Sequence, residues 1–97
     1  MDHRFYIGRC ALDLHVENCQ SLKDKRRVIS SLKEKLRNRF NCAVCEYGDL
    51  SLWQRTQLGI TLCANDRVVL DSVIKSLVDY LNRMHLATIV DFKYEII

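Results

Sequence analysis

Proline is missing from this chain of 97 residues, and glycine occurs only as Gly8, Gly48 and Gly59. The absence of proline removes one class of helix and strand breaker, so uninterrupted elements are expected. No apolar run approaches the roughly 18 residues that a membrane-spanning helix needs. The first ten residues, MDHRFYIGRC, carry charges where a signal peptide needs an apolar stretch. These absences predict a cytoplasmic protein.

The composition contains 48% apolar and 28% charged residues. This balance is typical of globular proteins and excludes the disordered and membrane classes. A chain of this length suffices for one small core. We therefore expect a single domain over residues 1–97.

The cysteines offer little support for a disulfide framework, because their number is odd and the chain has no secretory signal. They are Cys10, Cys19, Cys42, Cys45 and Cys63. Cys42 and Cys45 form a CxxC pair, but a zinc site needs two more ligands, and the three histidines are scattered. On a strand these two side chains would also point to opposite faces. We expect five buried or half-buried apolar cysteines, and no metal or cofactor.

Positive charge is concentrated in residues 21–40, SLKDKRRVISSLKEKLRNRF. Eight of the fifteen Lys and Arg residues lie there: Lys23, Lys25, Arg26, Arg27, Lys33, Lys35, Arg37 and Arg39. Only Asp24 and Glu34 oppose them, so the segment carries eight minus two, or +6, while the rest of the chain sums to −3. Such polarisation indicates an anionic partner more strongly than the net charge of +3 does.

Hydrophobic periodicity predicts that residues 21–40 form one helix, capped by Ser21 with Asp24 three residues later. Its core-facing stripe comprises Leu22, Ile29, Leu32, Leu36 and Phe40. One side of this stripe, which we name the basic flank, carries Lys23, Arg26, Arg27, Lys33 and Arg37. Lys25 falls inside the stripe. Either its stem covers apolar surface while its ammonium group reaches water, or it is a functional lysine.

Alternation of apolar and polar residues predicts strands at residues 5–16, 41–47, 58–64 and 88–97. The core-facing parity of the second strand is not determined. A second helix follows Asn65 or Asp66, and its apolar residues are Val69, Leu70, Val73, Ile74, Leu77, Val78, Leu81 and Met84. The connection over residues 48–57 holds Trp53 and Arg55, and it either caps the core or contacts a partner.

The order strand, helix, strand, strand, helix, strand predicts an α+β ferredoxin-like fold, βαββαβ. Right-handed crossovers would place both helices on one face of a four-stranded antiparallel sheet in the order 4-1-3-2. The uncovered face should include Ile7, Arg9, Ala11, Asp13, Thr61, Cys63, Ile89, Asp91 and Lys93. RNA recognition motifs stack bases on aromatic residues of the first and third strands, and those positions hold no aromatic residue here. Phe5 and Tyr6 lie at the start of the first strand, and Tyr6 has the core-facing parity, so base stacking on the sheet is not expected.

Three stretches resemble the YlxP-like family of small bacterial proteins: SLKDKRR, RNRFN, and the segment from Glu46 through DLSLWQRTQLG. The resemblance covers nearly the whole chain and implies a ferredoxin-like fold and bacterial origin. Members carry a domain of unknown function, and their genes often lie beside genes for translation initiation and ribosome maturation. The matching positions are Ser21, Lys23, Asp24, Lys25, Arg26, Arg27, Arg39, Phe40, Asn41, Asp49, Trp53, Gln54 and Arg55. The cysteines are not part of the family pattern.

Three functions follow from these features. The first is a non-enzymatic protein that binds RNA or the ribosome, with a role in ribosome assembly or translation, and that contacts phosphates through the basic first helix. Its expected contacts are Lys23, Lys25, Arg26, Arg27, Lys33, Arg37, Trp53 and Arg55. The alternative is a homo-oligomeric interaction module, such as a homodimer, that pairs its open sheet face through Ile7, Ala11 and Ile89. An enzyme using Asp13 and His15 has the least support, so we expect none.

Overall fold

The computed structural model describes residues 2–97 and contains six elements in the expected order. They are β1 (Tyr6–Val16), α1 (Leu22–Arg39), β2 (Ala43–Tyr47), β3 (Arg55–Ala64), α2 (Arg67–Met84) and β4 (Ala87–Ile96). The sheet order is β2-β3-β1-β4, and every neighbouring pair is antiparallel. The ferredoxin-like α+β prediction is therefore confirmed.

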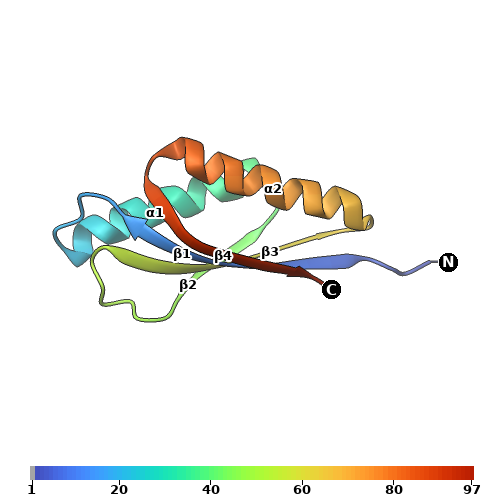
Figure 1. Cartoon of the computed structure of the whole chain (residues 1–97), viewed down its shortest axis with the longest axis horizontal. Coiled ribbons are helices and arrows are strands. Elements are labelled where there is room, and N and C mark those ends of the chain that lie inside the picture. Colours follow the sequence, from blue (N-terminus) through green and yellow to red (C-terminus); the bar gives the residue numbers. More distant parts are fainter. Residues whose placement is uncertain (1) are drawn as a thin grey trace.

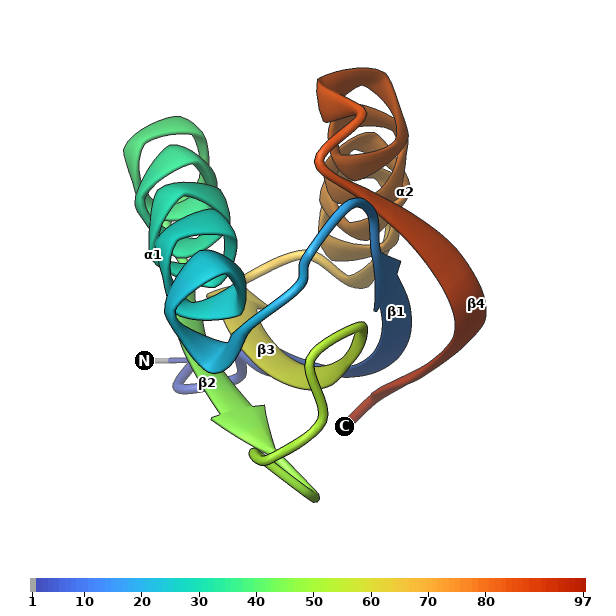
Figure 2. The ribbon, with the colours of Figure 1, turned by 90° about the vertical axis from the view of Figure 1, so that its left-hand side faces the viewer.

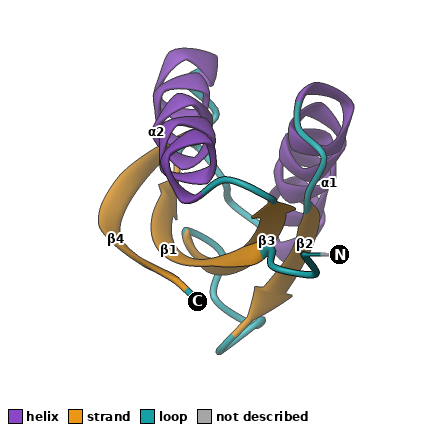
Figure 3. Ribbon diagram, turned by 90° about the vertical axis from the view of Figure 1, so that its right-hand side faces the viewer, coloured by secondary structure: helices purple, strands orange, loops and turns teal. Residues whose placement is uncertain are grey.

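Both helices lie on one face of the sheet and leave the other face uncovered (Figure 1). The end-on view in Figure 3 shows α1 above the β2 side of the sheet and α2 above the β1 and β4 side. This arrangement follows from the two right-handed crossovers, β1-α1-β2 and β3-α2-β4. It makes β2 one edge strand and sets α1 beside that edge.

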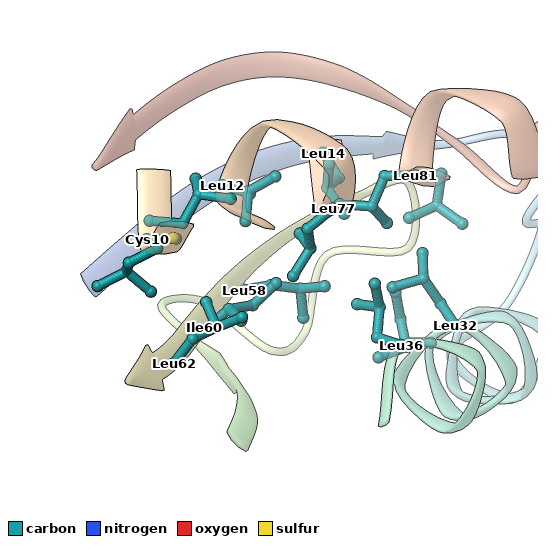
Figure 4. Close-up of a cluster of buried hydrophobic side chains, with 14 of the residues drawn as sticks. Cys10, Leu12, Leu14, Leu32, Leu36, Leu58, Ile60, Leu62, Leu77 and Leu81 are labelled. Carbon is teal, nitrogen blue, oxygen red and sulfur yellow. The ribbon is translucent and has the colours of Figure 1, made fainter. Parts of the chain in front are cut away.

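The core lies between the helices and the covered face of the sheet (Figure 4). Strand β1 contributes Cys10, Leu12, Leu14 and Val16, which are the even positions expected from its alternation. The helices contribute Ile29, Leu32, Leu36, Leu70, Ile74, Leu77 and Leu81. Val69 is exposed, so the predicted stripe of α2 was wrong at its first position, because the buried stripe is centred on Leu70, Ile74, Leu77 and Leu81 and Val69 lies to one side of it.

Each helix begins at a capping side chain. Ser21 Oγ accepts a hydrogen bond from the backbone N–H of Asp24 at 3.1 Å. Asp24 Oδ2 accepts from the backbone N–H of Gln20 at 3.3 Å, so the capping box closes one residue earlier than in the usual motif. Asp66, rather than Asn65, caps α2 through the N–H groups of the following turn.

Strand β3 starts at Arg55, three residues before the expected start, and the connection between β2 and β3 is correspondingly shorter. Pairing with β1 explains the difference, because Arg55 lies opposite His15 and Thr56 lies opposite Leu14. The polar residues Arg55 and Gln57 hid this part of the strand, since they face away from the core.

An irregularity in β4 reverses the expected parity at its start. Ile89 pairs with Leu14, whereas Asp91 pairs with Asp13, so the register shifts by one residue at Val90. Ile89 therefore packs against the core, and Val90 is 51% exposed. The prediction that Ile89 lies on the uncovered face was wrong, because a bulge inserts one residue that local alternation cannot reveal.

The cysteines divide between the two faces of the sheet. Cys10 and Cys19 are buried and Cys42 is half-buried, as expected. Cys45 and Cys63 are exposed, so the prediction that all five would be buried or half-buried was wrong. Both lie at positions that alternate onto the uncovered face, where neither helix reaches them.

Candidate nucleic-acid interface

The basic flank of α1 borders the β2 edge of the sheet. Arg37 Nη2 lies 3.5 Å from the backbone oxygen of Val44 on β2. Glu46 also lies on β2, and the positive charge of Lys33 is one of the effects that lower its pKa. Nearer the outer side of the helix, Lys23, Arg26 and Arg27 border a shared shallow hollow, which Glu34 also lines without forming an ion pair within 4.0 Å in residues 2–97. The five residues of the flank therefore form one continuous surface along α1, as the helical periodicity predicts.

The basic side chains of α1 other than Lys25 are not neutralised by ion pairs. Within residues 2–97, none of the seven comes within 4.0 Å of a carboxylate oxygen. Arg39, on the opposite side of the helix, lies over the ring of Tyr80 at 5.0 Å from its centroid. In contrast, Lys75 of α2 pairs with Asp71 at 2.8 Å. Six of the seven side chains are exposed and Lys33 is half-buried, so most of the excess positive charge of α1 faces solvent.

Lys25 is the exception, and the structure removes it from the exposed basic surface. Its side chain is 2% exposed, and its Nζ lies 3.0 Å from Glu46 Oε2 and 3.4 Å from the backbone oxygen of Leu50. The first interpretation of Lys25 expected its ammonium group to reach water. That expectation was wrong, because the group is buried and paired with Glu46. Since it is buried and paired, we no longer include Lys25 among the phosphate contacts.

Glu46 is held by two donors from different elements. The hydroxyl of Thr56 donates to Glu46 Oε2 at 2.6 Å, and Lys25 approaches the same oxygen. Burial alone would raise the pKa of Glu46, but the hydrogen bonds from Thr56 and Lys25 outweigh it, so the pKa lies below its ordinary value. This ion pair links the first turn of α1 to β2 and to the loop after it.

The loop over residues 48–54 holds the predicted contact Trp53. Figure 2 shows this loop close to the first turn of α1, where Lys25 bonds to Leu50. Gln54 anchors its far end, because Gln54 Nε2 donates to the oxygen of Cys19 at 3.3 Å. Trp53 is 52% exposed, and Leu50 and Leu52 are exposed beside it. The side chains point outward, although backbone contacts hold the loop to the body of the protein.

Arg55 does not join the basic flank. It lies on the uncovered face of the sheet, where its Nη2 contacts Asp13 Oδ2 at 2.5 Å and its Nε contacts Asp13 Oδ1 at 3.3 Å. This bidentate pair neutralises the guanidinium group. The sequence suggested Arg55 because of its neighbour Trp53, but alternation along β3 turns it away from α1.

Asp13 and His15 contact different partners. Asp13 binds Arg55, whereas His15 Nδ1 lies 3.1 Å from Glu17 Oε1. In the described part of the chain, no group of three His, Cys, Asp or Glu side chains is placed to hold a metal ion. Across residues 2–97, neither helix is both long enough and apolar enough to cross a membrane.

Residues 7–94 match the model of the family described as "Protein of unknown function (DUF503)". The chain belongs to this family. The chain is also 28% identical over 76 residues to "Uncharacterized protein YlxP" of Bacillus subtilis (strain 168). That match covers 78% of this chain and 83% of the relative. The resemblance to YlxP-like proteins is therefore confirmed.

A designed protein shares the fold of this DUF503 chain. "De novo designed protein Foldit4" matches with a TM-score of 0.56 and covers 97% of both chains at 8% sequence identity. At this identity the likeness concerns backbone architecture alone.

Two features of the site were missed by sequence reasoning. Glu46 is the partner of Lys25, and the only local signal was an acidic residue within a short apolar strand. Tyr47 lies on the uncovered face, next to Gly59, because Val44 and Glu46 take the covered face of β2. If the core-facing side of β2 had been known, both the Lys25–Glu46 pair and the position of Tyr47 could have been predicted.

Proposed function

We propose that this protein is a non-enzymatic cytoplasmic RNA-binding protein that contacts phosphate groups through the basic flank of α1, in a ribosome-associated role. The observation that carries the proposal is the set of exposed or half-buried cations on α1 with no carboxylate within 4.0 Å in residues 2–97. A solvated helix usually carries both signs of charge, as α2 does. A surface of uncompensated Lys and Arg attracts polyanions and releases their counterions on binding.

The spacing of the flank suits a nucleic-acid backbone. The helix rises about 1.5 Å per residue, so Arg26, Lys33 and Arg37 span roughly 16 Å along one side of α1. Phosphate contacts of this kind supply affinity without choosing a base sequence. The proposal therefore expects binding that is strong at low salt and tolerant of sequence.

The test is filter binding of bacterial ribosomal RNA over a range of salt concentrations. Replacing Arg26, Lys33 and Arg37 together by Gln should lower the slope of log affinity against log salt by about 3, or roughly one per lost phosphate contact. A matched control replaces Lys35, Arg67 and Arg83 by Gln, which removes the same charge from exposed positions away from the flank. No binding at low salt, or equal losses in both triple variants, would refute the proposal.

The homo-oligomeric alternative lost part of its support. It relied on Ile7, Ala11 and Ile89 at the uncovered face, and Ile89 packs against the core instead. Ile7 and Ala11 remain on that face, but charged neighbours such as Arg9 and Asp13 interrupt them. Sedimentation at micromolar concentration distinguishes this alternative, since it requires a dimer in the absence of RNA.

A further inference from the structure

A hollow of about 350 Å³ lies on the face of the sheet that the helices leave uncovered. Its floor is a row of small residues across three strands, because Ala11 of β1 pairs with Gly59 of β3 and Gly59 pairs with Cys45 of β2. A Cβ at Gly59 would lie 3.1 Å from Cys45 Sγ, so a larger residue would crowd this row. The floor is therefore shallow, flat and mainly apolar.

Two different side chains stand on opposite sides of this row. Tyr47 occupies one side, is 41% exposed, and has its Cδ1 3.7 Å from the position that a Cβ of Gly59 would take. Arg9 occupies the other side. Glu95 of β4 lies opposite it in the register, but in residues 2–97 no carboxylate oxygen lies within 4.0 Å of Arg9. One aromatic ring and one guanidinium group without a direct ion pair thus border the same apolar floor.

A planar aromatic group that carries negative charge fits these surroundings. Bases bind proteins by stacking on flat or aromatic surfaces, and guanidinium groups bind phosphate. We propose that the hollow binds an unpaired base of single-stranded RNA, with Tyr47 contacting the base and Arg9 contacting an adjacent phosphate. A base inside a duplex could not enter, because stacking and pairing cover its faces and edge.

The hollow and the basic flank lie on either side of one short strand. Val44 of β2 approaches Arg37 of the flank, whereas its neighbour Cys45 forms part of the floor of the hollow. An RNA strand that passes over the β2 edge can therefore contact both surfaces. This inference rests on the proposed function for most of the affinity, and it specifies that the RNA is single-stranded.

The test compares one labelled oligoribonucleotide with the same strand in a duplex, by fluorescence anisotropy at fixed salt. The protein should prefer the single strand by about tenfold, in line with the contribution of one stacked base. Tyr47→Leu should abolish the preference. Tyr47→Phe should retain it, because the aromatic ring stays and only the hydroxyl group is lost. Urea unfolding of each variant checks that the fold is kept.

A second measurement locates the base. Amide chemical shifts of Ala11, Cys45 and Gly59 should change on addition of the single strand or of millimolar adenosine 5′-monophosphate. The Gln triple variant of the basic flank should weaken single strand and duplex equally and leave the mononucleotide shifts unchanged. This measurement separates the two proposals, because binding of the mononucleotide in the hollow should not depend on the basic flank.

Several results would overturn the inference while leaving the proposed function standing. They are equal affinity for single strand and duplex, unchanged binding by Tyr47→Leu, or shifts confined to α1. If no RNA binds at all, the proposed function fails, and the mononucleotide titration alone decides whether the hollow binds a base. A dimer that Tyr47→Leu dissociates would show that a second copy covers this face, and would also overturn the inference.

Discussion

Lys25 shows how strongly the surroundings of one residue control its role. It belongs to the most basic segment of the chain, yet it is buried and pairs with Glu46 at 3.0 Å. Removing one partner of a buried ion pair leaves the other charge without compensation, which costs more than the intact pair contributes. The pair also explains how the loop over residues 48–54 stays attached to α1, since Lys25 bonds to Leu50 as well.

We expect Lys25→Met to lower the free energy of unfolding by about 3 kcal/mol, because the half-buried carboxylate of Glu46 would keep only the hydrogen bond from Thr56. The measurement is urea denaturation followed by circular dichroism. Lys35→Met is the matched control: Lys35 is exposed on α1, and its replacement should change stability by less than about 0.5 kcal/mol. Similar losses in the two variants would contradict the prediction.

The same pair predicts how stability depends on pH. The pKa of Glu46 is below its ordinary value of 4.5 in the folded protein, because the hydrogen bonds from Thr56 and Lys25 outweigh the opposing effect of burial. A lowered pKa means that this stabilisation is complete above pH 4.5 and is lost as the pH falls through the pKa of the folded state.

The stability difference between the native chain and Glu46→Gln should therefore be constant near neutral pH and shrink below pH 4.5. Denaturation curves measured from neutral to acidic pH check this. Glu17→Gln is a useful comparison, because the pKa of Glu17 is lowered by His15 and Thr88 but its side chain is exposed. A difference that grew on acidification would show that Glu46 is not stabilised in its ionised form.

At the scale of the element, α1 carries charges that oppose its own stability. Lys23 lies in the first turn, where the positive end of the helix dipole disfavours a cation. Lys23 and Arg27 are also four residues apart and repel each other, as do Lys33 and Arg37. A helix selected only for stability would place acidic residues at some of these positions. The pattern therefore supports a role for the charge in binding.

Lys23→Glu should stabilise the protein by about 0.5 to 1 kcal/mol, through the dipole and a new ion pair with Arg27. It should also weaken RNA binding, since Lys23 belongs to the basic flank. Lys35→Glu creates a similar ion pair with Arg39 on the other side of the helix and should leave RNA binding nearly unchanged. Thermal unfolding and filter binding of the two variants measure these effects together.

A loss of stability in Lys23→Glu would contradict this account of the helix. Equal loss of RNA affinity in the two variants would show that total charge matters, and that the basic flank has no special place in binding.

At the scale of the whole molecule, charge is separated between α1 and the rest of the chain. The segment containing α1 carries +6, and the remaining residues sum to −3. Salt screens both the repulsion inside α1 and its attraction to a polyanion. Folding and binding should therefore respond to salt with opposite signs.

Raising sodium chloride from about 0.05 M to about 0.5 M should increase the free energy of unfolding by a few tenths of a kcal/mol. Over the same range, affinity for RNA should fall by about 100-fold or more if three phosphates are contacted. Urea denaturation and filter binding in matched buffers test both. RNA affinity that did not change with salt would contradict phosphate contact through α1.

The order of elements, the buried face of β1 and the surface of α1 that carries the basic flank could all be predicted from the amino-acid sequence. These features follow from short-range periodicity, because positions such as Leu12, Leu14, Leu32 and Leu36 face the core through repeats of two or about 3.6 residues. The same reasoning placed Ser21 at the start of α1. It also predicted the ferredoxin-like topology, since right-handed crossovers leave few alternatives.

The contacts between residues that are distant in the chain could not be predicted in this way and are known from the folded structure. Lys25 pairs with Glu46, Arg55 pairs with Asp13, and the bulge at Val90 places Ile89 against the core. The first contact depends on which face of β2 packs against α1, and the other two depend on the register between strands that are far apart in the chain. Local alternation specifies neither. The orientation of Tyr47 depends on it too, and this orientation completes the hollow on the uncovered face. The charge pattern could therefore be predicted from the sequence. The contacts that bury Lys25, pair Arg55 and leave the basic flank without ion pairs in residues 2–97 could not.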